Sequence, residues 1–95
     1  MIYFIDIETK KNGDLIIIGV MDIDGKYFYY TDIREFVKFY NNLARKDKIY
    51  CYNVEFDFFR IIQECLNNDI DIKFNGFFNS AGCIYGIWRG IYWLD

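Results

Sequence analysis

The chain has 95 residues, of which 54% are hydrophobic and 22% aromatic, and its formal net charge is −3. This length suits one domain with a single core, and the hydrophobic fraction excludes an intrinsically disordered chain. The charge argues against a protein that holds nucleic acid by overall positive charge, and the absence of His excludes imidazole-based metal sites, nucleophiles and general bases.

A first strand is expected at the N-terminus, where residues 1–5 are apolar and rich in β-branched and aromatic side chains. Successive strand side chains point to opposite faces, so Asp6 and Glu8 share one face, and Ile5 and Ile7 share the other. We expect the two carboxylates to repel each other and to lose solvation, a cost that Mg²⁺ or another hard cation would remove. The alternative is a strand that frays at Asp6 and leaves both acids solvated.

The next segment is expected to complete an antiparallel meander of three strands. Turn signals at residues 12–14 and 24–25 bound two apolar runs, residues 15–21 and 27–30. The second strand is apolar on both faces, which indicates a position inside the sheet.

A helix is expected over residues 32–45. Asp32 and Glu35 have the spacing of a capping box, and an apolar stripe at helical period follows them. Arg45 and Lys46 then lie where the end of a helix attracts positive charge.

A short strand over residues 48–52 and a second helix from Asn53 through Leu66 are expected next. Five apolar side chains recur there at helical spacing: Val54, Phe58, Ile61, Ile62 and Cys65. Strand, helix, strand and helix after a meander favour one mixed α/β sheet with helices packed against it.

The C-terminal third gives a weaker pattern. Residues 70–74 alternate like a half-exposed strand, residues 75–76 indicate a turn, and residues 77–82 are irregular. Residues 83–89 and 91–95 are expected to form an apolar hairpin. We expect this hairpin to be uncovered, and we expect self-association through it.

The three cysteines, Cys51, Cys65 and Cys83, are scattered and form no CxxC pair. This pattern predicts buried reduced thiols and a cytoplasmic, reducing compartment. No apolar run reaches about 18 residues, and no signal-peptide pattern opens the chain, so we expect a soluble protein without a membrane partner.

A second acidic stretch follows the fourth expected strand. Asn53 is a favoured N-cap, and Asp57 then lies one turn later, near the junction of strand and helix. Phe56 is expected to point into the core beside Asp57. The alternative is that Glu55 and Asp57 are only acids that the helix dipole favours in a first turn.

Together the two acidic stretches resemble the first two motifs of the DEDD family of 3′–5′ exonucleases, most closely the proofreading domain of B-family DNA polymerases. Residues 4–9, FIDIET, resemble the first motif, an apolar strand carrying D-x-E and then Thr. Residues 52–57, YNVEFD, resemble the second motif, N-x-x-F-D. The resemblance implies a ribonuclease-H-like fold: a three-strand antiparallel meander, then helix, parallel strand, helix and C-terminal hairpin.

The resemblance also implies a chemistry and a set of site residues. It implies hydrolysis of the terminal phosphodiester at a single-stranded DNA 3′ end with two Mg²⁺ or Mn²⁺ ions. Asp6, Glu8 and Asp57 would be the catalytic metal ligands. Asn53 would orient the substrate strand, and Thr9 would meet the terminal nucleotide through its backbone.

The sequence departs from this family at the third motif, which supplies a fourth carboxylate and a Tyr or His that positions water. No Y-x-x-x-D follows Asp57, so we expect residues 1–95 to be one exonuclease-like domain that is incomplete at its C-terminus. Activity would then need a missing segment or another subunit, and Asp95 would substitute only if the chain end folded back to Asp6.

Two alternatives remain. One is a non-catalytic ribonuclease-H-like domain that binds a nucleic-acid end or a protein partner through its aromatic surface. The other is a resolvase or ribonuclease-H-type endonuclease, which shares the acidic first strand but leaves N-x-x-F-D unexplained.

Overall fold

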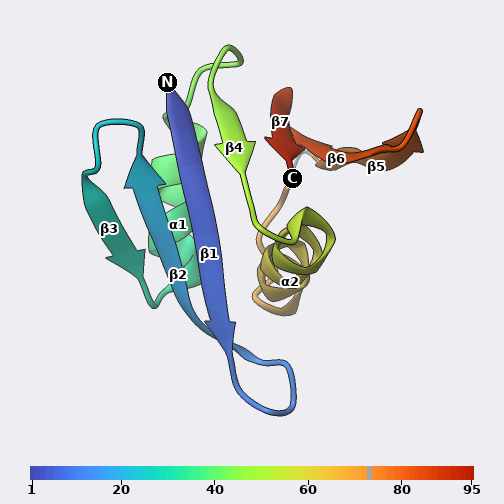
Figure 1. The fold of residues 1–95 in the computed structure, drawn as a ribbon. Helices are drawn as coiled ribbons and strands as arrows, with labels where there is room; N and C mark the ends of the chain where they lie inside the picture. Colours follow the sequence, from blue (N-terminus) through green and yellow to red (C-terminus); the bar gives the residue numbers. More distant parts are fainter. Residues whose placement is uncertain (73) are drawn as a thin grey trace.

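The computed structural model describes residues 1–72 and 74–95, which form a seven-stranded mixed sheet and two helices (Figure 1). The elements in chain order are β1 (Ile2–Thr9), β2 (Leu15–Asp22), β3 (Tyr27–Tyr30), α1 (Ile33–Asn41), β4 (Lys48–Tyr50), α2 (Val54–Asn67), β5 (Phe74–Ser80), β6 (Cys83–Trp88) and β7 (Ile91–Leu94). The strand order is β3-β2-β1-β4-β7-β6-β5. The predicted α/β class and mixed sheet are confirmed.

The N-terminal meander is confirmed, because β2 pairs antiparallel with both β1 and β3. Ile5 and Ile7 point into the core, whereas Asp6 and Glu8 lie on the other, exposed face. The predicted division of β1 into an apolar face and an acidic face is therefore correct.

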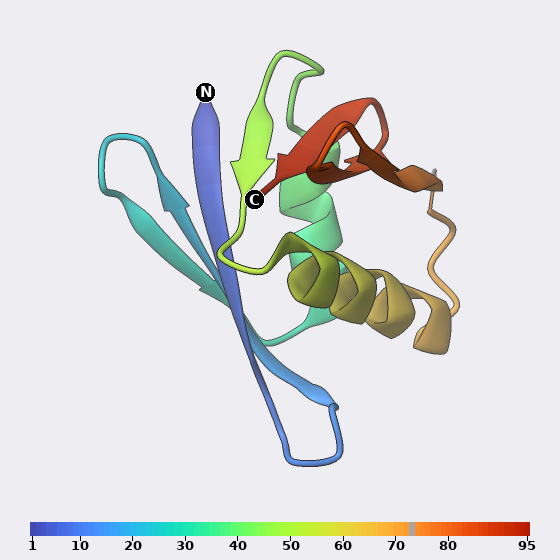
Figure 2. The same ribbon diagram turned by 45° about the vertical axis from the view of Figure 1, so that its right-hand side comes forward.

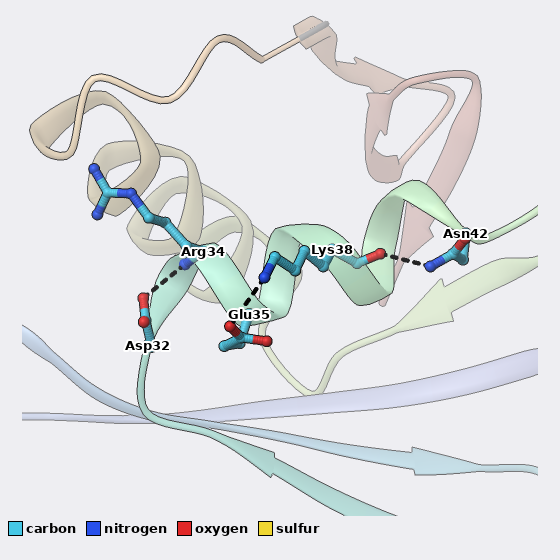
Figure 3. A network of polar contacts seen from close by, with 5 residues as sticks. All are labelled: Asp32, Arg34, Glu35, Lys38 and Asn42. Atoms are coloured by element: carbon cyan, nitrogen blue, oxygen red, sulfur yellow. Dashed lines mark hydrogen bonds and ion pairs between the residues drawn. The ribbon is translucent and has the colours of Figure 1, made fainter.

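The start of α1 agrees with the prediction in part (Figure 3). The backbone N–H of Arg34 donates to Oδ1 of Asp32 at 2.9 Å, so Asp32 is the N-cap. The Glu35 carboxylate does not complete a capping box. It accepts from Nζ of Lys38 at 3.2 Å instead, one helical turn further along.

The predicted end of α1 at Arg45 is wrong, since the helix ends at Asn41. The side-chain amide of Asn42 donates to the carbonyl of Lys38 at 2.9 Å (Figure 3), and the backbone N–H of Asn42 also bonds to the last turn. These bonds close the helix early. Arg45 therefore lies in the loop before β4 and does not contribute to the helix terminus.

The second helix is confirmed in place and in its buried face. Its inward side chains are Val54, Asp57, Phe58, Ile61, Ile62 and Cys65. The expectation for Phe56 is wrong: it is 40% exposed, and the guanidinium of Arg60 lies over its ring at 5.3 Å. Asp57 and Phe58 take the inward positions, because positions three and four residues after Val54 share its face.

The region before the C-terminal hairpin differs from the prediction. The predicted strand at residues 70–74 includes Lys73, which lies outside the described residues, and residues 70–72 are not a strand. The segment predicted as irregular belongs to β5, which pairs antiparallel with β6. Phe77 packs on Phe58 and Phe59, with ring centroids 5.6 and 4.7 Å apart. Tertiary packing thus overrides the local turn signal at residues 75–76, where only the register shifts.

The C-terminal hairpin forms as predicted, but its inner face is covered. Trp88 and Trp93 are 1% and 0% exposed. The ring of Tyr40 stacks on Trp88 at 4.0 Å, its hydroxyl donates to the Trp88 carbonyl at 2.8 Å, and Nε1 of Trp93 donates to that hydroxyl at 2.8 Å. The expectation of an uncovered hairpin is therefore wrong for this side, because Tyr40 of α1 and Phe58 of α2 pack on β6 and β7.

The helices leave one face of the sheet open, and a continuous apolar row crosses all seven strands on that face. The row, here called the aromatic row, follows the pairing register through Tyr27, Met21, Phe4, Tyr50, Leu94, Tyr85 and Phe78. Four of these side chains, Tyr27, Met21, Phe4 and Phe78, are between 37% and 49% exposed. The apolar surplus in the composition therefore lies largely on this face.

The prediction of buried, reduced cysteines holds for two of the three cysteines. Cys51 and Cys65 are buried and free, as predicted, but Cys83 is exposed at the start of β6. In the described part of the chain, no helix combines the length and the apolarity needed to cross a bilayer.

Replacing Tyr40 by Phe tests the link between α1 and the hairpin. The change removes the bond to the Trp88 carbonyl and leaves the buried Nε1 of Trp93 without its acceptor. We expect a loss of about 1–3 kcal/mol in the free energy of unfolding, measured by urea denaturation. The matched change Tyr92→Phe, at an exposed residue, is expected to have little effect. Equal losses for both variants would contradict this role of Tyr40.

Candidate functional site

A cleft of about 730 Å³ lies on the open face over β1, β2, β3 and β4, beside the loop that leads from β4 to α2. Figure 2 shows the C-terminus beside the end of β4 and above the first turn of α2. The cleft is lined by Phe4, Ile5, Asp6, Gly19, Met21, Tyr27, Tyr50, Cys51, Tyr52 and Asp95. It thus joins the part of the aromatic row on β3, β2, β1 and β4 to the carboxylates of Asp6 and Asp95.

Asp6 projects into this cleft from the centre of the sheet. It lies opposite Gly19 in the β1–β2 register, and it is exposed. Glu8 is exposed as well, so the expectation that these two acids lose solvation is wrong. The open face gives both side chains access to water.

The desolvated acid is Asp57, which is only 4% exposed in the first turn of α2. Burial, followed by the negative charges of Asp6 and Asp95, raises the pKa of Asp57 to about 6, even though hydrogen bonds from Cys51 and the Asn53 backbone lower it. A carboxylate loses hydration when it is buried, and like charges nearby add to that cost. The structure therefore brings Asp57 into the electrostatic field of Asp6.

Asp95 reaches the same point from the end of β7. The backbone N–H of Val54 donates to Oδ1 of Asp95 at 3.3 Å, so Asp95 meets the start of α2. Asn53 occupies the N-cap position, but its side chain makes no capping bond with the described residues. The chain end therefore folds back to the acidic site, which the sequence left as a conditional expectation.

Glu8, Thr9 and Asn53 lie at the margin of this site. Burial is the largest cause of the raised pKa of Tyr27, and Tyr29, Asp6 and Glu8 follow in that order. Glu8 is not among the groups that raise the pKa of Asp57. Thr9 is three residues beyond Asp6, roughly 10 Å along the strand. Asn53 is exposed at the start of α2. The structure therefore brings Asp6, Asp57 and Asp95 together more closely than it does the full predicted set.

Sequence reasoning missed Tyr27 and Gly19 as parts of the site. A Cβ at Gly19 would collide with the Tyr27 hydroxyl, so this glycine gives the ring room to lie across β2 beside Asp6. Only the strand register reveals this contact, because Tyr27 is 21 residues from Asp6 in the sequence.

Cys51 was predicted only as a buried thiol, yet it is part of the acidic site. Burial raises the pKa of the Cys51 thiol, and the negative charge of Asp57 raises it further. The thiol is 5% exposed and is hydrogen-bonded with Asp57. It therefore stays protonated and serves as a hydrogen-bond donor to the carboxylate.

The donor set suits hard divalent cations in charge and chemistry. Asp6, Asp57 and Asp95 offer carboxylate oxygens, and a cation would remove the repulsion that raises the pKa of Asp57. Within residues 1–72 and 74–95, no three metal-binding side chains lie close enough together to hold an ion by themselves. Mg²⁺ commonly takes one or two carboxylates and completes its shell with water and phosphate, so this wider spacing fits such a site.

The chain matches no family model, no curated protein and no solved structure. The function of the cleft is therefore argued from its own residues.

The raised pKa of Asp57 predicts a pH-dependent stability. Its folded value of about 6 lies above the ordinary value of 3.8, so the native state binds the proton more tightly than the unfolded chain. The free energy of unfolding is therefore highest at low pH, where Asp57 is protonated. It falls as the pH rises from about 4 to 6, and the total loss above pH 6 is up to about 3 kcal/mol.

The Asp57→Asn variant is expected to lose this dependence and to be more stable than the parent chain at pH 8. Urea denaturation between pH 4 and pH 8 in the presence of EDTA measures both effects. Asp24→Asn, at an exposed turn residue, is the control. A parent chain whose stability does not fall between pH 4 and pH 6 relative to Asp57→Asn would contradict the raised pKa.

Proposed function

We propose that the chain is a ribonuclease-H-like, metal-dependent 3′–5′ exonuclease domain that hydrolyses terminal phosphodiesters of DNA. The observation that carries this proposal is the convergence of Asp6, Asp57 and Asp95 from three separate elements beside one cleft. A buried carboxylate under the charge of two others is costly to folding, and such costs are typical of functional sites.

The topology supports the proposed fold. An antiparallel meander supplies the acidic strand β1, the parallel strand β4 adjoins it, and α2 leaves β4 directly above the acids. This is the order of elements that the resemblance to the DEDD exonucleases implies. β7 then extends the sheet parallel to β4.

In the proposed site, Asp6 and Asp57 would hold Mg²⁺ or Mn²⁺ together with water and substrate phosphate, and Glu8 would add a carboxylate from the margin. Bound ions would supply positive charge that polarises the phosphodiester and acidifies a water nucleophile. Asp57 is held by its buried position and by the Cys51 thiol. Asp6 is open to the cleft, where a substrate phosphate can complete the coordination.

Two residues offer what the missing third motif supplies. Asp95 provides a fourth carboxylate beside Asp57, and the Tyr27 hydroxyl near Asp6 and Glu8 provides a group that can orient water or substrate. Asn53 and Thr9 flank the acids and would contact the substrate strand. The free cysteines are consistent with a reducing, intracellular setting.

A second candidate function is non-catalytic binding of a nucleic-acid end or a protein partner on the same fold. The aromatic row favours it, because exposed aromatic rings stack on bases without any chemistry. In this case the acids would shape the end of a binding surface. A second copy of the chain is the partner to test first by sedimentation, since an oligomer would cover the same row.

Metal binding tests the acidic site directly. We expect Mn²⁺ to bind the parent chain and to bind the Asp6→Ala variant at least about tenfold more weakly, because a charged ligand is lost. Isothermal titration calorimetry measures both affinities. The control is Asp24→Ala, which removes an exposed acid from the β2–β3 turn. Equal Mn²⁺ binding by the parent chain and the Asp6→Ala variant would refute the proposed metal site.

Digestion of DNA distinguishes the two candidate functions. With Mn²⁺ and labelled single-stranded DNA, we expect the parent chain to shorten the strand from its 3′ end, and Asp57→Asn to be at least about 100-fold slower because a metal ligand is neutralised. The same DNA with a blocked 3′ end is the substrate control. Binding without shortening would favour the non-catalytic domain.

A further inference from the structure

A second cleft, of about 660 Å³, lies at the other end of the sheet from the acids. It is lined by Leu43, Arg45, Asn75, Ile87, Arg89 and Gly90. Figure 1 shows the loop between α1 and β4 and the start of β7 at the end of the sheet opposite the tip of β1. Two arginines from distant parts of the chain thus share one hollow.

Neither guanidinium is neutralised within the part of the chain that the structure describes. Residues 1–72 and 74–95 contain no ion pair and no side-chain hydrogen bond that involves Arg45 or Arg89. The acid closest to Arg45 in the sequence, Asp47, is already occupied, since it accepts from the N-terminus at 2.9 Å and from the backbone N–H of Ala44 at 2.8 Å. The two positive charges therefore remain available to a ligand.

Gly90 gives Arg45 its place in the cleft. A Cβ at Gly90 would lie 3.1 Å from Nε and 3.3 Å from Cδ of Arg45. The Arg45 side chain therefore lies against the backbone of the β6–β7 turn. This contact places Arg45 against the turn that carries Arg89, and both residues line the cleft, although they are 44 positions apart in the sequence.

Arg89 occupies a position for which turn chemistry does not select arginine. Its φ is +55°, and that of Gly90 is +77°, which is the pattern of a two-residue hairpin turn that favours Asn-Gly. Arg89 is exposed, so packing does not explain the choice. The equivalent turn between β5 and β6 has Ala81 at φ +52° followed by Gly82, and it provides a matched comparison without a charge.

We propose that the Arg45–Arg89 cleft binds a phosphate group. Guanidinium groups match phosphate oxygens in charge and in fork geometry. Asn75 accepts from the backbone N–H of Gly90 through Oδ1 at 3.1 Å, which leaves its amide NH₂ as a third donor. This site does not depend on the nuclease activity, because it lies apart from the acids.

The phosphate can come from a free ion or from a nucleic-acid strand. The open face favours the strand as the natural source. Ile87 lines the cleft and shares that face with Tyr92 and with Lys48, which lie opposite it in the register. The aromatic row adjoins them. A single strand held by its phosphate at the arginines would lie with its bases over these rings.

An NMR titration tests the site with two probes, inorganic phosphate and a short oligothymidylate, both in EDTA. We expect the backbone amide of Gly90 to shift with each probe. Arg45→Gln and Arg89→Asn are each expected to weaken binding about tenfold or more, since each removes charged donors. Arg89→Asn keeps or raises the melting temperature, because Asn is favoured at positive φ, so weaker binding by this variant does not come from unfolding.

Two control variants make the result decisive. Lys46→Gln removes a neighbouring exposed charge outside the cleft, and Ala81→Asn changes the matched turn; both are expected to bind like the parent chain. Loss of both probes in the arginine variants supports a nucleic-acid phosphate, and loss of inorganic phosphate alone supports a free ion. No binding by the parent chain, unchanged binding in the arginine variants, or an equal loss in Lys46→Gln would overturn the proposal.

Discussion

The short central strand β4 determines where the acidic residues of this protein meet. It has only three residues, Lys48–Tyr50, and it pairs in parallel with both β1 and β7. Parallel neighbours have their carboxyl ends at the same edge of a sheet. Because β4 ends early, α2 begins beside Asp6, and the parallel β7 delivers Asp95 to the same place.

The charges of the molecule are separated along the strands by this arrangement. Asp57 and Asp95 follow the carboxyl ends of β4 and β7 and meet Asp6 in the middle of β1, while Arg45 and Arg89 lie toward the opposite end of β4 and β7. The aromatic row crosses the sheet between them. A net charge of −3 conceals this separation, because a sum over the chain contains no information about position.

Asp57 carries the largest electrostatic cost among these acids. Its neighbours on the helix, Val54 and Phe58, pack into the core, so the same face that stabilises α2 also buries the carboxylate. The burial of Asp57 lowers the stability of the fold, and it follows from the orientation of α2. The helix cannot bury Phe58 without also turning the adjacent Asp57 inward. Proteins keep such groups where function requires them.

Local patterns in the sequence were enough to predict the meander, the two helices, the faces of β1 and the first turn of α2, since hydrophobic period and capping act over short distances. Long-range packing formed strand β5 and brought Asp6 to Asp95 and Tyr27, whereas α1 ends early through the local bonds of Asn42. Asp57 was expected beside the acids of β1, yet its burial followed from packing alone. Pairings between distant strands place these groups, and no local pattern records a register that is set by the whole sheet.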